Sequence, residues 1–409
     1  MHASPRTTTA LALALGATLL VVSPVSAGTP TTQQRHRGES SRVIIDWERT
    51  SIRTVYTEGL SPVPSGALYL GFTSLAMYGA VQRAQHVGHS SATAAAAVAA
   101  HDVLAEYFPA SQATLDADLA TSLAAVPDGP AEATGTRIGA AVADALIASR
   151  ADDGRNDPSI VYAKPAGVGV WQPAAGGSML VPWLGFVRPL VLRHVIGAPG
   201  PDSLTSADYA ADFDETRRLG AATGSERTAW QTDTALFFNS NSAILLSEAV
   251  LRLLDEEPMS LRRTARMFAA MHAAMADSII AVWRQKYDVG FWRPIQAIAG
   301  AADDGNPATE PQEGWASLLP TPPYSDYVSG HAGLTGPAAE VIRRFLGDHT
   351  TLTLHSYNTS SDRTCASISA IEADALDSRI WGGLHFRTAM DDGYAIAHRT
   401  ARCVLARLG

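Results

Sequence analysis

The sequence predicts an all-α protein made of one or two packed helical bundles, and three features of the chain support this fold class. Hydrophobic residues make up 46% of the 409 residues, which is enough to bury a sizeable core. Apolar residues recur at spacings of three and four, as on the buried face of an amphipathic helix. No stretch shows the sustained alternation of apolar and polar residues that is typical of a half-buried strand.

The helical pattern starts near Arg42 and continues into the C-terminal region. Five stretches fit it best and are predicted to be helices, namely residues 67–83, 91–106, 131–149, 235–254 and 261–284. A further helix is predicted over 332–346, after the proline-rich stretch 320–324. His331 is therefore expected at a loop-to-helix junction, where free backbone N–H groups are available to an anion.

The first 27 residues are typical of a cleaved secretory signal peptide. They carry Arg6 in a short polar start, an apolar run over 10–22, and small residues before Gly28. An N-terminal membrane anchor is the alternative, but the apolar run is shorter than the roughly 20 residues that a spanning helix needs. We therefore expect a secreted protein without a membrane span in its mature part.

Charge and cysteine content narrow the function classes. The formal net charge of -9 disfavours a nucleic-acid partner, because such binding usually needs a broad basic surface. Cys365 and Cys403 are the two cysteines of the chain, too few for a cluster held by thiolates. An oxidising compartment would permit a disulfide between them without establishing one.

A change of composition divides the chain into two halves. Residues 151–201 are rich in Gly, Pro and Trp, which predicts a long ordered loop. We expect this loop within an N-terminal helical half, 28–230, which precedes a C-terminal helical half, 231–409. Long loops in compact proteins are often functional, so the loop is expected either to cover a pocket or to wrap between the halves.

Three short segments in the last third of the chain concentrate basic and hydroxyl side chains. They are Lys286-x6-Arg293-Pro294, Ser329-Gly330-His331, and Ser378-Arg379-x5-His385. Lysine is rare in this chain and occurs elsewhere only at Lys164. Each segment alone has an ordinary structural explanation, such as a charge at a helix end, a helix cap or a satisfied core histidine.

Together the segments predict a site for a multiply charged tetrahedral oxyanion. Lys286, Arg293 and Arg379 would place three positive charges around one point of an otherwise acidic protein. Arginine binds oxyanions through two parallel N–H groups, and Ser329 and Gly330 would add neutral donors. Of the two histidines, one would bond the central atom and the other would transfer protons.

These motifs, K-x6-R-P, S-G-H and S-R-x5-H, resemble the signature of the vanadium-dependent haloperoxidase and type 2 phosphatidic acid phosphatase superfamily. Residues 47–78, the loop at 182–183 and residues 230–409 look like its secreted bacterial haloperoxidase-like branch. The resemblance implies two packed helical bundles with the active site in the C-terminal one. It also implies vanadate as the cofactor.

The resemblance further implies a role for each residue of the motifs. Equatorial vanadate oxygens would be held by Lys286, Arg293, Ser329, Gly330 and Arg379. His385 would bind vanadium axially, His331 would be the acid-base group, and Lys286 would also polarise bound peroxide. Hydrogen peroxide and halide would then yield a hypohalous-acid-like species that halogenates a small organic acceptor. The sequence is compatible with a monomer or a homo-oligomer.

The chain departs from the family pattern at three positions. Val328 precedes Ser329 where many members have proline, and Tyr324 stands where phosphatase members commonly carry serine. Ala389 occupies a position where many members place an aspartate that orients the final histidine. A backbone carbonyl is the alternative partner for His385.

Two other functions use the same residues. A secreted acid phosphatase of this superfamily would hydrolyse phosphomonoesters without vanadate, with His385 attacking phosphorus and His331 protonating the leaving alcohol. A non-catalytic helical protein would keep the cage as an anion-binding site, but buried cations are costly to maintain without a ligand. Tyr324, Trp292 and the length of the chain favour the peroxidase.

Overall fold

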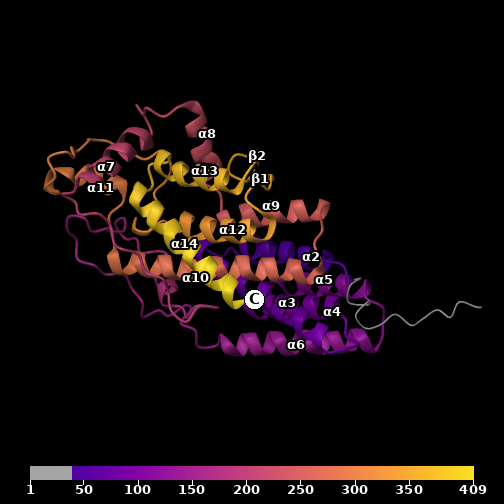
Figure 1. Cartoon of the computed structure of the whole chain (residues 1–409). Coiled ribbons are helices and arrows are strands. Elements are labelled where there is room, and N and C mark those ends of the chain that lie inside the picture. The colour runs from indigo at the N-terminus through magenta and orange to yellow at the C-terminus, as the bar shows by residue number, and fades with distance from the viewer. Residues whose placement is uncertain (1–38) are drawn as a thin grey trace, which may run out of the picture.

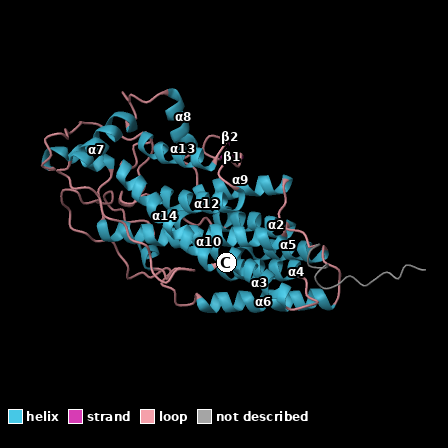
Figure 2. Ribbon diagram, viewed as in Figure 1, coloured by secondary structure: helices cyan, strands magenta, loops and turns pink. Residues whose placement is uncertain are grey.

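The computed structural model describes residues 39–409, so the predicted signal peptide at 1–27 lies outside the described residues. Helices make up 61% of the structure and dominate both views of it (Figures 1 and 2). Within the described part, the one sheet is an antiparallel hairpin that pairs β1 (Leu352–Ser356) with β2 (Ser361–Cys365). The prediction of an all-α fold is confirmed, with this hairpin as an addition that the sequence pattern did not indicate.

The helices follow one another along the chain in two groups. The first group comprises α2 (Arg42–Ile52), η1 (Arg53–Glu58), α3 (Val63–His86), α4 (Ala92–Tyr107), η2 (Pro109–Ser111), α5 (Gln112–Ala124) and α6 (Pro130–Ser149). After η3 (Pro182–Phe186), the second group comprises α7 (Ala207–Gly220), α8 (Ala229–Phe237), α9 (Ser242–Glu256), α10 (Leu261–Val289), α11 (Pro294–Gly300), η4 (Ala301–Asp303), α12 (Gly330–Leu346), α13 (Ile368–Trp381) and α14 (Arg387–Arg407).

Helix α10 forms the centre of the molecule. It packs against α3 of the first group and against α12 and α14 of the second (Figure 1). Among the described residues, α10 alone is long and apolar enough to cross a membrane, but 94% of its most apolar stretch is buried inside the protein. Such burial is typical of a core helix. The division at residue 230 stays a prediction, because α10 belongs to the packing of both groups.

The prediction of one helix over 235–254 is wrong, because α8 ends at Phe237 and α9 begins at Ser242. Asn241 caps α9, since its side-chain oxygen accepts a hydrogen bond from the N–H of Ala243 at 3.0 Å. Ser240 turns inward and its hydroxyl lies 2.8 Å from that of Ser356 on β1. Short polar side chains that bond to nearby backbone thus interrupt a helix that the apolar spacing alone predicted to continue.

The segment 151–201 contains no regular structure longer than η3, as predicted for a long loop. It lies against the connection between α10 and α11, where the Trp171 N–H donates to the Gly290 carbonyl at 2.8 Å. The Leu180 N–H donates to the Pro323 carbonyl at 2.9 Å, and the Leu180 carbonyl accepts from the indole of Trp283 at 3.1 Å. The loop therefore runs beside the end of α10 and the stretch before Ser329, and the choice between a cover and a wrap between the halves stays a prediction.

A buried carboxylate on α10 anchors the end of this loop. The side chain of Asp277 accepts hydrogen bonds from the backbone N–H groups of Leu190, Val191 and Leu192 at 2.5, 3.0 and 2.8 Å. Three donors that would otherwise need water are therefore satisfied by one side chain inside the protein.

Replacing Asp277 by alanine is expected to lower the free energy of unfolding by about 3 kcal/mol, because three buried N–H groups lose their acceptor. Chemical denaturation followed by circular dichroism measures this change, and limited proteolysis locates it in the loop. The control is Asp288→Ala on the same helix, where the side chain is 45% exposed in a surface pair with Arg284. Equal stability of the two variants would contradict the assignment.

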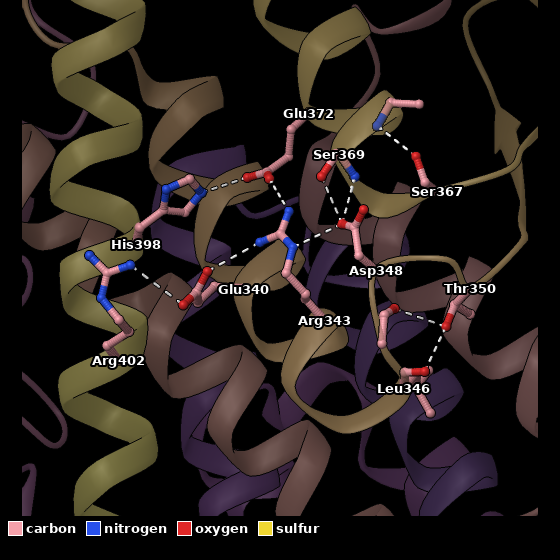
Figure 3. A network of polar contacts seen from close by, with 12 residues as sticks. Glu340, Arg343, Leu346, Asp348, Thr350, Ser367, Ser369, Glu372, His398 and Arg402 are labelled. Carbon is pink, nitrogen blue, oxygen red and sulfur yellow. Dashed lines mark hydrogen bonds and ion pairs between the residues drawn. The ribbon is translucent and has the colours of Figure 1, made fainter.

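Arg343 on α12 holds three helices of the second group together (Figure 3). Its guanidinium pairs with Glu340 at 3.1 Å, Asp348 at 2.9 Å and Glu372 of α13 at 2.5 Å. Glu372 in turn lies 2.6 Å from Nε2 of His398 on α14. Ion pairs that share partners in such a network fix geometry better than isolated surface pairs. The network therefore fastens the relative positions of α12, α13 and α14.

Candidate oxyanion-binding site

The structure brings the three predicted segments together inside the second group of helices. Lys286 lies near the end of α10, Arg293 precedes α11, and Arg379 is in the last turn of α13. Ser329 is the N-cap of α12, whose first residues are Gly330 and His331. His385 lies between α13 and α14. These side chains are buried, with at most 1% exposure, except that of His331, which is partly exposed.

Lys286 is fully buried, so it is not the solvent-facing charge that its place near a helix end also allowed. Its ammonium donates to the carbonyls of Ser325 at 2.7 Å and Asp326 at 2.9 Å. It also lies 5.0 Å from the centre of the Tyr324 ring. Burial, and then the neighbouring Arg293, lower the pKa of Lys286 well below its usual value. When protonated, an ammonium has three donors, so one remains for a ligand.

Two arginines present donors that the protein leaves without partners. Arg293 donates through Nε to the Tyr324 carbonyl at 2.8 Å and through Nη1 to the Leu384 carbonyl at 2.6 Å, while its buried Nη2 has no hydrogen-bond partner among the described residues. Arg379 donates through Nη1 to Asn239 at 3.1 Å, and its buried Nε has no such partner either. Burial lowers the pKa of Arg379 to about 10.

These unpaired nitrogens fit a tetrahedral oxyanion such as vanadate or phosphate. Buried donors are normally satisfied, so a group of them in one place indicates an anion that would accept their hydrogen bonds. Nε2 of His331 is a further buried atom without a partner among the described residues. At Gly330 a β-carbon would lie only 3.2 Å from the Trp283 ring, which explains the absence of a side chain there.

The two histidines are held neutral in the free site. Burial is the main cause that lowers the pKa of His331 well below its usual value, followed by Arg379 and Arg293. Burial likewise lowers the pKa of His385, followed by Arg293 and Lys286. Nε2 of His385 lies 3.1 Å from Nη1 of Arg293. The same Nη1 lies 3.5 Å from Nδ1, so Nε2 is the nearer of the two ring nitrogens to arginine, which only donates.

Asp326 is a member of the site that the sequence analysis missed. Its Oδ1 lies 2.7 Å from Nδ1 of His385 and 3.7 Å from Nη1 of Arg293. Burial raises the pKa of Asp326 to about 7, although Arg293 and Lys286 oppose the rise. The sequence could have indicated Asp326, because it lies three residues before Ser329, in a stretch that must fold against the site.

The connection between α8 and α9 also contributes to the site, which the prediction of a continuous helix concealed. Asn239 accepts the hydrogen bond from Arg379, and His331 forms a hydrogen bond with the backbone of Ser240. The polar run at 239–242 was the available signal. Because Asn239 is neutral, it orients Arg379 without cancelling its charge.

Replacing Asn239 by aspartate is expected to weaken the binding of phosphate and vanadate about tenfold or more. A carboxylate at this place would neutralise Arg379 and repel an anion in a poorly screened interior. Isothermal titration of the purified protein with each anion measures the effect. Asn241→Asp is the matched control, because aspartate caps a helix as well as asparagine and the contacts of the Asn241 side chain are with the start of α9 and with Tyr56, not with Arg379. Unchanged affinity in Asn239→Asp would contradict this role.

Comparison with known proteins finds similarity to vanadium-dependent enzymes. The family model of the VCPO second helical-bundle domain matches residues 266–408. Vanadium chloroperoxidase of Curvularia inaequalis is 28% identical over an alignment of 186 residues, and the match covers 37% of this chain and 30% of that protein.

Solved structures show a similar fold over most of the chain. The first bacterial vanadium-dependent iodoperoxidase superposes with a TM-score of 0.73 at 19% identity, covering 90% of this chain and 97% of that one. An apo-type bacterial vanadium-dependent chloroperoxidase gives a TM-score of 0.66 at 16% identity, covering 85% and 93%. At these identities the likeness concerns the fold alone.

Proposed function

Because the chain belongs to the vanadium-dependent haloperoxidase and type 2 phosphatidic acid phosphatase superfamily, we propose that it is a vanadium-dependent haloperoxidase. It would use hydrogen peroxide to oxidise a halide to a hypohalous-acid-like species that halogenates a small organic acceptor. The observation that carries the proposal is the group of buried nitrogens without partners, Nη2 of Arg293, Nε of Arg379 and Nε2 of His331, in the same site as His385.

The residues of the site divide the work of holding an oxyanion. Lys286, Arg293 and Arg379 would bind its oxygens as cations, while Ser329 and the N–H of Gly330 would add neutral donors at the start of α12. Nε2 of His385 would bond the central atom. Vanadate, when bound there, supplies a Lewis acid that activates hydrogen peroxide.

His331 is suited to move protons in this reaction. The residue is the partly exposed one of the group, although its Nε2 is buried toward the site. The lowered pKa keeps the ring neutral, and a neutral imidazole can accept a proton at Nε2 from incoming peroxide. Lys286, with one remaining donor, would withdraw electron density from the same ligand.

Turnover assays on the purified protein test the proposal. The protein loaded with orthovanadate is given hydrogen peroxide, a phenol as acceptor, and iodide, bromide or chloride in turn. We expect halogenation that depends on vanadate with at least one halide. A parallel assay without vanadate uses p-nitrophenyl phosphate. No halogenation with any halide would overturn the proposal, and phosphate release would then favour the phosphatase. Anion binding with neither turnover would favour a non-catalytic role.

Export is a separate part of the proposal and rests on the sequence of residues 1–27. Expression of the full chain in a bacterial host with a general secretion pathway should yield protein outside the cytoplasm. Its N-terminus, determined by Edman degradation, is expected near Gly28. Full-length protein retained in the membrane would instead indicate an N-terminal anchor.

A further inference from the structure

A carboxylate from a distant loop faces Nδ1 of His385. Oδ1 of Asp326 lies 2.7 Å from Nδ1 of His385, and both side chains are at most 2% exposed. We propose that Asp326 is a positioning residue that orients His385 and holds the proton on Nδ1, so that Nε2 faces the ligand. This inference rests on the proposed function, in which His385 bonds the central atom of the oxyanion.

A ligating histidine needs such a partner. The nitrogen that does not bind the ligand usually donates to a carboxylate or carbonyl, which fixes the tautomer and the orientation of the ring. The segment that follows His385 does not supply a carboxylate at the expected place, because position 389 is a buried alanine. The carbonyl of Ala389 is already engaged, since it accepts the N–H of Ser329 at 2.9 Å.

The contacts of His385 agree with this tautomer. Nη1 of Arg293, which can only donate, lies 3.1 Å from Nε2 and 3.5 Å from Nδ1, so the nearer nitrogen, Nε2, is the better placed acceptor. In the neutral ring the proton is then on Nδ1, where it faces Asp326. Of the two alternatives that the sequence left open, a side-chain carboxylate occupies the place of the orienting partner.

The carboxylate of Asp326 is itself held by the rest of the site. Its backbone N–H donates to the Phe291 carbonyl at 2.9 Å, and its carbonyl accepts from the ammonium of Lys286 at 2.9 Å. The N–H of Phe386, next to His385, lies near the carboxylate and lowers its pKa, while neither carboxylate oxygen has a hydrogen bond of normal geometry among the described residues. Asp326 therefore links Lys286 to His385 through one residue, and the position of the ring depends on a fixed rather than a mobile acceptor.

The cavity beside Asp326 suggests that a carboxylate at another position could replace that of Asp326 as the partner of His385. Asp326 and Ala389 both line a small cavity of about 10 Å³ between Phe291, Tyr209 and Phe386. Removal of the Asp326 side chain would enlarge this cavity next to the β-carbon of residue 389. A carboxylate introduced at position 389 would then enter the space that the original carboxylate leaves.

Four variants of the full chain without vanadate test the inference: Asp326→Ala, Asp326→Asn, the double variant Asp326→Ala with Ala389→Asp, and the control Asp392→Ala. Asp392 accepts a hydrogen bond from Tyr327 nearby and has no contact with His385. Titration with orthovanadate gives the affinity. NMR of protein labelled with 15N-histidine gives the tautomer of His385 from its ring nitrogen shifts, and circular dichroism confirms folding.

We expect Asp326→Ala to weaken vanadate affinity about 10- to 100-fold and to convert the single Nδ1–H tautomer to a mixture. Asp326→Asn should lose less, because an amide oxygen still accepts the proton, and the double variant should recover part of the affinity. Asp392→Ala should bind as the wild type does.

An unchanged tautomer and unchanged affinity in both Asp326 variants would overturn the inference. If Asp326→Ala does not fold, the Asp326→Asn and double variants decide alone. The readouts are vanadate affinity and the nitrogen shifts of the His385 ring, and neither requires halogenation. A failure of the proposed function can therefore be distinguished from a failure of this inference.

Discussion

Replacing His385 by alanine is expected to abolish halogenation, with a loss of turnover of at least about thousandfold, or about 4 kcal/mol in the activation barrier. The variant loses the ring that would bond the central atom, while Lys286, Arg293 and Arg379 remain. An anion held only by charges and hydrogen bonds would bind more weakly and without the fixed axial direction. The measurement is the initial rate of halogenation at saturating peroxide and halide.

The control for this experiment is His349→Ala, which changes an exposed histidine that takes part in none of the contacts of the site. It should keep the full rate. Vanadate affinity is measured for both variants, so that loss of the anion is separated from loss of reactivity. Full turnover in His385→Ala would refute the role of this residue, whatever the substrate proves to be.

Replacing Glu48 by alanine is expected to lower the free energy of unfolding by about 3–5 kcal/mol. Glu48 belongs to a polar network that is fully buried among α2, α3, α9 and α10. Its Oε1 accepts from Ser74 at 2.8 Å, and its Oε2 lies 3.2 Å from Nδ1 of His272. Nε2 of His272 lies 2.9 Å from the hydroxyl of Ser247.

Removal of the carboxylate leaves a cavity in the interior, and Ser74 and Nδ1 of His272 keep only each other, at 2.8 Å, in place of the shared carboxylate. The midpoint of guanidinium denaturation measures the loss. Asp46→Ala, on the same helix, is the control, because its side chain is 47% exposed in a surface pair with Arg42 and should change stability by less than about 0.5 kcal/mol. Similar midpoints for the two variants would show that the network adds little.

Local patterns in the sequence predicted the positions of five helices, α3, α4, α6, α10 and α12. Helix α10 was predicted over 261–284 and extends to Val289, because the buried face of its last turn carries Lys286 in place of an apolar residue. The hairpin of β1 and β2 was not predicted, since two strands of five residues are too short for alternation to stand out. The break at 238–241 depends on side chains that cap and turn the backbone, which an apolar pattern does not contain.

The motifs named most of the residues that the structure gathers at the site, because their spacing is a property of the chain itself. The sequence did not predict that Asp326 and Asn239 belong to the site. Their partners, His385 and Arg379, are far away in the sequence and come close only when the chain folds. Whether the two cysteines pair also depends on contacts between distant residues, which the sequence does not show. Cys365 is buried and Cys403 exposed, and both are free.

The continuity of α10 restricts how the two groups of helices can move relative to each other. This helix of 29 residues contains neither proline nor glycine, and it packs against both groups of helices. A hinge between the two groups would have to bend this helix, which the hydrogen bonds along its backbone resist. Lys286, in the last turn of α10, is therefore held in a fixed position relative to both groups.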